Sequence, residues 1–248
     1  MKIIRFAWGG QALFGILDGN LIYALHGDVF GEFSRGEFRI SVEGARILPP
    51  VSSSKVLTMG ANYRTYSITG GIPTHNIKVP TTVVGHEDPV AYPADVTELI
   101  MEAELAIVIG RRARNVPPEK TAEYILGYTV ANDFTARDIA RKDGRHTRAK
   151  NYDGFCPLGP VIETELDPGN LAIRARVNGE VKQNGSTREM ITQVPEVVSL
   201  YSRVMTLHPG DVILTSTPTE PPYVQVGDVV EAEIEGIGIL RNRIVAPS

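Results

Sequence analysis

Several features that would place this chain in a functional class are missing or scarce. Its single cysteine, Cys156, excludes an internal disulfide and fits a reducing cytoplasm, which is where we expect the protein. No apolar run approaches the ~20 residues of a transmembrane helix, and we expect no secretory signal because MKIIRFAWGG lacks an apolar core. A net charge of −4, without runs of Lys or Arg, argues against nucleic acid or an anionic membrane as a partner. A small-molecule substrate is the partner that we expect.

The first 50 residues have a pattern of their own. Short segments of alternating hydrophobicity, KIIRFAW, ALFGILD and LIYALHG, are separated by Gly-Gly and Asp-Gly-Asn. Such breaks are typical of hairpins, so we predict a small N-terminal β region over residues 1–50. Pro49, Pro50 and the serines at 52–54 mark the boundary. Residues 51–248 form the predicted catalytic domain, and a hydrophobic content of 42% is enough for a sizeable core.

The remaining segments predict mainly strands. KVLTMGANY at 55–63 predicts a buried strand, and the Gly-, Ser- and Thr-rich residues 64–76 predict a loop. Residues 117–133 predict a turn and a helix start that lead into a strand. Apolar residues from Val197 to Leu207 recur at helical spacing, and Pro209-Gly210 ends this predicted helix. DVILTSTP and VGDVVEAEIEGIGILRNRIV predict further strands. The fold class is therefore a β-rich α+β fold.

Two glutamates stand one residue apart, Glu102 and Glu104, in the apolar segment TELIMEAELAIVIGRR. Side chains alternate faces along a strand, so both carboxylates point to one side, with Leu105, Ile107 and Ile109 on the other. Two like charges side by side in an apolar strand are costly unless something positive lies between them. A divalent cation is the simplest compensation.

Further charged residues follow. Asp133 comes after 28 intervening residues, in YTVANDFTARD, and Lys150 after 16 more, in RAKNYDGFCPLGP. Three carboxylates without a nearby His or Cys cluster favour Mg²⁺, Mn²⁺ or Ca²⁺ over zinc. Lys150 would balance the excess negative charge and place an ammonium where a bound oxyanion lies. Two alternatives stay open: the glutamates as a solvated strand face, and Asp133 as a helix N-cap.

Taken together, Glu102-x-Glu104, Asp133 and Lys150-x-x-Asp153 resemble the signature of the fumarylacetoacetate hydrolase family. Other blocks are similar to the family's and run in its order: ILPPVSSSKVLTMGANYR, GYTVANDFTARD, RAKNYDGFCPLGPVI, VNGEVKQNGSTREMI, HPGDVILTSTP and VGDVVEAEIEGIGIL. The resemblance implies a mixed β-sandwich roll of the family's C-terminal domain type and a homodimer. It also implies that Glu102, Glu104 and Asp133 hold Mg²⁺ or Mn²⁺ and that Lys150 is catalytic.

The same resemblance implies four substrate-binding residues, namely Tyr63, Lys78, Arg137 and Thr217. Lys78 matches the family's Lys-Pro block only partly because Val79 precedes Pro80, so it is either a pocket cation or a surface lysine. Thr217 lies in TSTP, where Ser216 replaces the family's usual glycine. A serine is a poor substitute wherever the backbone needs a positive φ.

The resemblance is weakest at a lid segment. Many hydrolases of the family carry Asn-Tyr-x-x-His-x-x-Glu, in which the His–Glu dyad activates the attacking water. Here Tyr66 and Thr69 stand at those two positions. Tyrosine, with an ordinary pKa near ~10, is a poor base at neutral pH. His75 or His86 would be the substitutes if either folds back over the site.

These patterns predict a metal-dependent enzyme that cleaves a carbon–carbon bond in a small oxo-acid or 1,3-dicarbonyl compound. The resemblance implies an acylpyruvate-type hydrolase that works through a metal-stabilised enolate, with Lys150 supporting the developing charge. The altered lid keeps an oxo-acid decarboxylase or isomerase open as an alternative, because these reactions mainly need the enolate to be stabilised. A metal-binding scaffold or pseudoenzyme is the alternative from a different class.

Overall fold

The computed structural model describes residues 1–65 and 73–247. Its two α-helices are α1 (Arg137–Asp143) and α2 (Val194–Val204), and its 3-10 helices are η1 (Val42–Gly44), η2 (Pro80–Thr82), η3 (Pro118–Tyr124), η4 (Pro168–Asn170) and η5 (Thr187–Glu189). Its strands are β1 (Lys2–Trp8), β2 (Gln11–Asp18), β3 (Leu21–Gly27), β4 (Phe33–Ser41), β5 (Arg46–Ile47), β6 (Val56–Gly60), β7 (Thr74–Lys78), β8 (Val83–Val84), β9 (Pro89–Ala91), β10 (Leu99–Ile100), β11 (Ala103–Ile109), β12 (Ile125–Asn132), β13 (Thr135–Ala136), β14 (Cys156–Glu163), β15 (Ala172–Val177), β16 (Glu180–Ser186), β17 (Val212–Leu214), β18 (Tyr223–Val224), β19 (Val229–Ile234) and β20 (Gly238–Val245).

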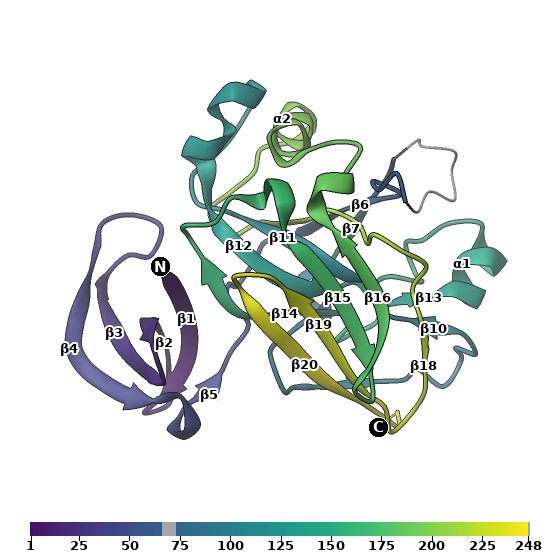
Figure 1. Cartoon of the computed structure of the whole chain (residues 1–248), viewed down its shortest axis with the longest axis horizontal. Helices are drawn as coiled ribbons and strands as arrows, with labels where there is room; N and C mark the ends of the chain where they lie inside the picture. Colours follow the sequence, from purple (N-terminus) through teal and green to yellow (C-terminus); the bar gives the residue numbers. More distant parts are fainter. Residues whose placement is uncertain (66–72, 248) are drawn as a thin grey trace.

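Three sheets organise these strands (Figure 1). The largest follows the order β4-β3-β2-β1-β14-β12-β11-β17-β6-β7, with β5 beside β1 and β8 beside β14. The second follows β16-β15-β19-β20-β9, and the third β13-β10-β18. The predicted β-rich α+β class is therefore confirmed. No helix among the described residues is long and apolar enough to cross a membrane.

The N-terminal strands form the meander that their alternating pattern predicts, at the left of Figure 1. Gly9 and Gly10 both have positive φ, as a two-residue hairpin turn requires, and Trp8 pairs with Gln11 across it. Strand β1 also pairs with β14, so these strands continue the large sheet. The proposed division of the chain at residue 50 stays a prediction.

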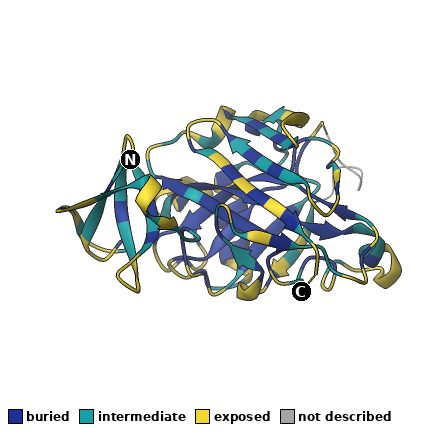
Figure 2. Cartoon of the chain, turned by 90° about the horizontal axis from the view of Figure 1, so that it is seen from below, coloured by how far each residue is buried: buried dark blue, intermediate teal, exposed yellow. Residues whose placement is uncertain are grey.

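Strand β11 lies between β12 and β17 in the large sheet, and every one of its residues is buried. Figure 2 shows that buried residues gather in the middle of the molecule. Leu105 and Ile107 belong to one hydrophobic cluster, and Ala106 and Val108 belong to another on the opposite face. A strand covered on both faces is expected to be apolar throughout. The alternative of a solvated strand face is therefore wrong. Glu102 lies one residue before the strand rather than within it.

Two predicted boundaries are wrong. The amphipathic helix ends at Val204 and not at Leu207, because Met205 is extended and Leu207 pairs with Ala113. Backbone pairing with a distant segment thus overrides the local helical pattern. The predicted loop at 64–76 ends early because Thr74 begins β7, which pairs antiparallel with β6.

Candidate metal centre and active site

Three carboxylates converge where β11 begins and β12 ends. One oxygen each of Glu102, Glu104 and Asp133 lies within 4.8 Å of the others, an arrangement that could hold a metal ion. The antiparallel register explains the meeting, because Glu104 pairs with Ala131 and the Asp133 amide donates to the Glu102 carbonyl oxygen at 2.9 Å. Asp133 is not a helix N-cap, since α1 begins at Arg137 after Ala136. The predicted ligands therefore meet, although their role as ligands stays a prediction.

Burial makes this carboxylate group costly without a cation. Glu104 is only 2% exposed, and its Oε2 accepts a hydrogen bond from the Ser216 amide at 2.7 Å. Burial, together with the charges of Asp133 and Glu102, raises the pKa of Glu104 well above its ordinary value. Three hard oxygen donors are the ligands that Mg²⁺, Mn²⁺ and Ca²⁺ prefer. The donor chemistry thus fits a divalent cation.

Two lysines from different parts of the chain contact Asp133, one on each carboxylate oxygen. Lys78 Nζ lies 2.5 Å from Asp133 Oδ1, and Lys150 Nζ lies 2.5 Å from Oδ2. Burial acts to raise the pKa of Asp133, but the ammonium groups of Lys150 and Lys78 outweigh it and hold that pKa below its ordinary value. Asp133 is therefore an ionised carboxylate fixed in position on both oxygens.

Lys78 is fully buried, so the alternative of a surface lysine is wrong. Besides contacting Asp133, its Nζ donates to the carbonyl oxygens of Phe134 at 3.0 Å and Phe155 at 2.7 Å. Lys78 thus makes two hydrogen bonds to backbone carbonyl oxygens and one ion pair with Asp133. The geometry gives Lys78 a positioning role toward Asp133, and its predicted contact with substrate has no support from the structure.

Lys150 reaches the carboxylates from the segment between α1 and β14. Its Nζ donates to Glu102 Oε2 at 3.2 Å and to Thr135 Oγ1 at 2.8 Å, in addition to Asp133. Burial acts to lower the pKa of Lys150, but the surrounding carboxylates outweigh it and raise that pKa above its ordinary value. The ammonium therefore stays charged at neutral pH. Asp153, the last residue of the signature, is exposed.

A cavity of about 120 Å³ opens onto these residues. It offers space for a small ligand beside Glu102 and Lys150. It is lined by Gly60, Ala61, Thr74, Asn76, Ile100, Glu102, Thr135, Arg137, Ala140, His146, Lys150, Ser216 and Pro221.

The four predicted substrate-binding residues differ in their access to this cavity. Arg137 lines it and donates to Tyr223 Oη at 3.2 Å. Tyr63, Lys78 and Thr217 are at most 1% exposed and are not among the lining residues. Burial raises the pKa of Tyr63, and the charge of Glu104 raises it further. Thr217 Oγ1 accepts from Gln183 Nε2 at 2.9 Å. Substrate binding by these residues stays a prediction.

Ser216 has the positive φ that is unusual for a residue other than glycine. Its φ is +80°, in the region that normally favours glycine, and its amide donates to Glu104. Strain of this kind costs on the order of 1–3 kcal/mol and is often found at functional sites. The hydrogen bond to a buried carboxylate offsets part of that cost.

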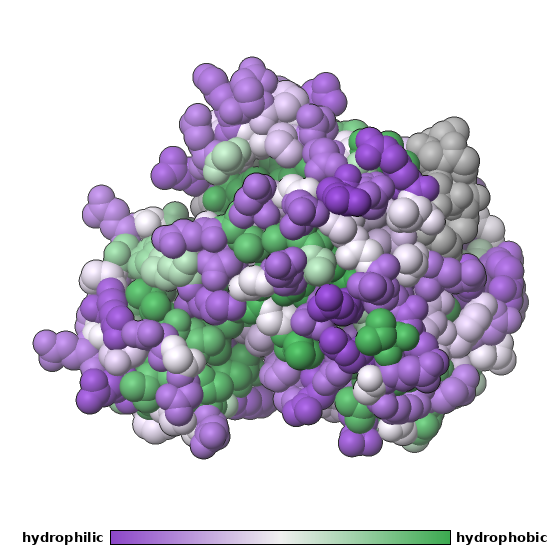
Figure 3. Space-filling view, in the orientation of Figure 1, coloured by the Kyte–Doolittle hydropathy of each residue, from purple (hydrophilic) through white to green (hydrophobic). Residues whose placement is uncertain are grey.

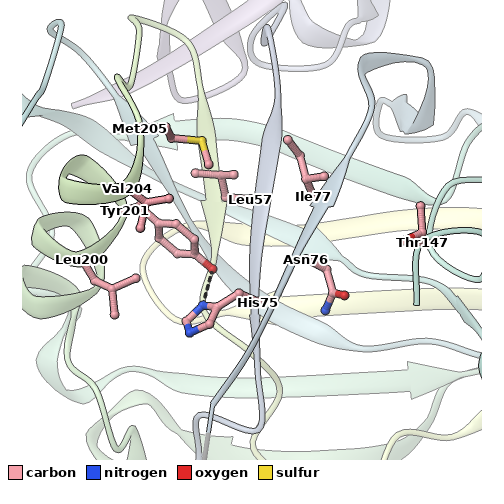
Figure 4. A pocket seen from close by; sticks show the side chains of 9 residues that line it. All are labelled: Leu57, His75, Asn76, Ile77, Thr147, Leu200, Tyr201, Val204 and Met205. Carbon is pink, nitrogen blue, oxygen red and sulfur yellow. Dashed lines mark hydrogen bonds between the residues drawn. The ribbon is translucent and has the colours of Figure 1, made fainter. Parts of the chain in front are cut away.

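Neither histidine that we considered as a substitute base faces the carboxylates. His75 lines a separate, mostly apolar cavity of about 600 Å³ beside α2, where its Nδ1 lies 3.1 Å from Tyr201 Oη (Figure 4). His86 Nδ1 accepts from the Arg241 amide. The prediction that His75 or His86 replaces the missing lid base is therefore wrong, because neither side chain reaches the carboxylates. The lid positions Tyr66 and Thr69 lie outside the described residues.

His146, which was not predicted from the sequence, lines the cavity together with Glu102 and Lys150. It precedes Lys150 by four residues, and the Lys150 amide donates to the His146 carbonyl oxygen at 3.0 Å, as in a helical turn. The four-residue spacing was the available signal, because such residues lie on one side of a helical turn.

Comparisons with known proteins agree with the fold. Residues 58–245 match the model of the fumarylacetoacetate hydrolase C-terminal domain, and residues 1–50 match an Rv2993c-like N-terminal model. The chain is 36% identical to oxaloacetate tautomerase YisK of Bacillus subtilis over 84% of this chain and 76% of that protein.

Solved structures extend the likeness over the whole chain. A 2-hydroxyhepta-2,4-diene-1,7-dioate isomerase from Mycobacterium marinum is 38% identical, with a TM-score of 0.95, over 100% of this chain and 99% of that one. A fumarylacetoacetate hydrolase from Exiguobacterium antarcticum is 35% identical, with a TM-score of 0.91, over all of both chains.

Proposed function

Since this chain belongs to the fumarylacetoacetate hydrolase family, we propose that it is a divalent-metal-dependent enzyme that interconverts the keto and enol forms of a small 2-oxo diacid. One observation carries the proposal: Glu102, which meets Glu104 and Asp133, lines a cavity together with the charged Lys150. Among its relatives, the Bacillus subtilis protein is named an oxaloacetate tautomerase and the Mycobacterium marinum protein a dienedioate isomerase, and both support this choice within the family.

Glu102, Glu104 and Asp133 would hold the cation, and Mg²⁺ or Mn²⁺ is the proposed ion, with Ca²⁺ also compatible with oxygen donors. When bound, a divalent cation supplies a Lewis acid that polarises a carbonyl oxygen. The raised pKa of Glu104 supports this assignment, because a cation among the three carboxylates would relieve the repulsion that causes it.

Positively charged side chains of the protein would complement the cation. Lys150 presents a charged ammonium to the cavity, where it would stabilise negative charge that develops on a substrate oxygen. Lys78 and Lys150 fix Asp133 through both carboxylate oxygens, so the site is organised before substrate arrives. Arg137 lines the same cavity and offers a guanidinium to a substrate carboxylate.

Hydrolysis of an acylpyruvate-like carbon–carbon bond is the second candidate, favoured by the likeness to the Exiguobacterium antarcticum hydrolase. Hydrolysis needs an activated water, and Tyr66 and Thr69 stand where the lid dyad is expected. Keto–enol interconversion needs no water as a reactant. The chain retains every charged group that stabilises an enolate, so we place tautomerisation first.

Turnover of a small panel separates the candidates. We expect oxaloacetate and a dienoic oxo-diacid to be tautomerised in the presence of Mg²⁺ or Mn²⁺ but not with EDTA, and an acylpyruvate to be cleaved slowly. Fast acylpyruvate cleavage would instead establish the hydrolase, and pyruvate release from oxaloacetate would establish a decarboxylase. No turnover of any compound would support the scaffold alternative. The exposed Glu180→Gln serves as a control for Glu102→Gln, which should abolish turnover.

Assembly and location are proposals too. A homodimer is supported by apolar side chains on the surface: Trp8 and Phe38, on the N-terminal strands, are 45% and 43% exposed, and their ring centroids lie 5.6 Å apart. Figure 3 shows hydrophobic surface over this part of the molecule. Exposed apolar patches often mark protein interfaces. Light scattering that finds a stable monomer at micromolar concentration would remove the dimer. The cytoplasm stays the proposed compartment.

A further inference from the structure

His146 lies in the turn between α1 and β14, one helical turn before Lys150. The Lys150 amide donates to the His146 carbonyl oxygen at 3.0 Å. Residues four apart on such a turn project to the same side, and both side chains line the cavity of about 120 Å³ that Glu102 also lines. An imidazole and an ammonium therefore face the same small space from one turn.

The His146 imidazole is distinct among the five histidines of the chain, all of which lie in the described ranges. His75 is bonded to Tyr201, His86 accepts from Arg241, and His26 and His208 are exposed outside the cavity. His146 is half-buried, and none of the described residues hydrogen-bonds to its ring. Both ring nitrogens are thus available to a ligand.

The surroundings keep this imidazole neutral. Burial lowers the pKa of His146, and the nearby ammonium of Lys150 lowers it further, whereas Glu102 and Asp133 act in the opposite direction without reversing the shift. A neutral imidazole has one nitrogen that accepts a proton and one that donates. It is therefore equipped to take a proton from one substrate atom and return it to another.

We infer that His146 is the proton-transfer residue of this site, carrying the proton between the carbon next to the keto carbonyl and the carbonyl oxygen. The inference rests on the proposed keto–enol interconversion. The C–H proton moves to a His146 ring nitrogen, the C–H electron pair forms the C=C bond, and the carbonyl π pair moves to oxygen. The imidazolium then gives its proton to that oxygen, and the enol forms.

The reverse sequence gives the keto form, so the imidazole ends each turnover as it began. No water, oxidant or second reactant is consumed. Lys150 contributes charge beside the oxygen, while its ammonium disfavours a long-lived imidazolium and so favours return of the proton. This assignment would supply a base in a chain where Tyr66 and Thr69 replace the expected lid dyad.

The test compares His146→Gln with His208→Gln, which removes an exposed imidazole outside the cavity. Oxaloacetate is the probe, and NMR in D₂O follows both tautomerisation and deuterium incorporation at C3, with Mg²⁺ present. We expect His146→Gln to lose both activities by about 10²–10⁴-fold, the usual contribution of a positioned acid–base group. Calorimetry should find Mn²⁺ affinity unchanged, since His146 is not among the carboxylates. His208→Gln should match the wild type.

The outcomes are distinguishable. Wild-type tautomerisation with a His146→Gln variant that stays within threefold of it would overturn the role of His146 alone. A wild type that turns over neither oxaloacetate nor a dienoic oxo-diacid would overturn the proposed function, and the role of His146 with it. Loss of activity in His75→Gln but not in His146→Gln would assign the base to the neighbouring apolar cavity.

A spectroscopic measurement does not depend on turnover. Oxalate has two adjacent oxygens, like an enolate of a 2-oxo acid, and serves as the probe with Mg²⁺. In protein labelled with ¹⁵N-histidine, oxalate should shift the His146 ring resonances, assigned by their absence in His146→Gln, and leave those of His208 in place. Unshifted His146 resonances at saturating oxalate would contradict contact between the imidazole and the ligand.

Discussion

Replacing Glu104 with Gln should change the stability of the protein in opposite directions with and without a divalent cation. In the metal-free protein, Glu104 either buries a charge beside Asp133 and Glu102 or binds a proton, because its surroundings raise its pKa. Glutamine avoids both requirements. Its Oε1 can still accept the hydrogen bond that the Ser216 amide donates to Glu104. Without a cation, Glu104→Gln should therefore be at least as stable as the wild type.

The sign of the pH dependence follows from the same shift. The folded pKa of Glu104 lies above its ordinary value of 4.5, so its contribution to stability is complete below that value. The contribution is lost as the pH rises through the folded pKa. Glu104→Gln does not lose stability in this way, because glutamine does not ionise. In EDTA, the stability of the variant relative to the wild type should therefore grow as the pH rises above about 4.5.

Cation binding reverses the order. At a Mg²⁺ concentration of about 100 times Kd, binding stabilises the wild type by about 2.7 kcal/mol. For a chain of this size, about 1 kcal/mol shifts Tm by about 2–4 °C, so Tm should rise by about 5–11 °C. If the lost charge weakens binding by about 100-fold, the variant gains only about 0.4 kcal/mol at the same concentration, or about 1 °C.

Thermal unfolding followed by circular dichroism in EDTA and in Mg²⁺, between about pH 6 and 8, measures both effects. Glu180→Gln is the matched control, because it removes an exposed carboxylate from β16 and should behave as the wild type in both buffers. A Glu104→Gln variant that is less stable than the wild type in EDTA as well as in Mg²⁺ would refute the crowding of carboxylates as the cause. Equal cation-induced shifts in both proteins would refute Glu104 as a ligand.

Three further predictions concern the neighbours of the carboxylates. Lys150→Met should lower kcat by about 10²–10³-fold while Mn²⁺ still binds in calorimetry, because the ammonium acts on transition-state charge; unchanged kinetics would contradict this role. Lys78→Met should cost about 3–5 kcal/mol in urea denaturation, since Asp133 keeps only one of its two buried ammonium partners, and a smaller loss would count against the positioning role. Tyr66→His combined with Thr69→Glu should raise acylpyruvate hydrolysis, by up to ~10²–10⁴-fold, without raising oxaloacetate tautomerisation; a parallel rise in both would show that the two reactions share a base.

Much of the fold follows from local pattern. The segments 2–8, 12–18 and 21–27 are strands almost to the residue, because alternating side chains and glycine turns specify hairpins without help from distant residues. The end of α2 could not be predicted in this way. Its apolar spacing continues to Leu207, and only the pairing of Leu207 with Ala113 shows that the helix has already ended.

The candidate site was likewise predictable only in part. The three carboxylates were predictable as a set because their order and spacing resemble a family signature. Burial of Lys78 was not, since nothing in HNIKVPTT indicates that Asp133, far along the chain, will lie 2.5 Å from its ammonium. The positive φ of Ser216 likewise occurs together with a hydrogen bond to Glu104, which only the folded sheet brings within reach.

The two halves of the proposed chemistry rest on different kinds of structure. The carboxylates lie at the ends of buried central strands, where register and packing on both faces fix their positions. His146 lies in a turn between elements, and connecting segments tolerate substitution far better than central strands. One charged centre can therefore serve several reactions, with the base supplied by different loops. For this chain the consequence is specific: removing one imidazole should abolish tautomerisation, whereas a hydrolase with its base elsewhere would keep its activity.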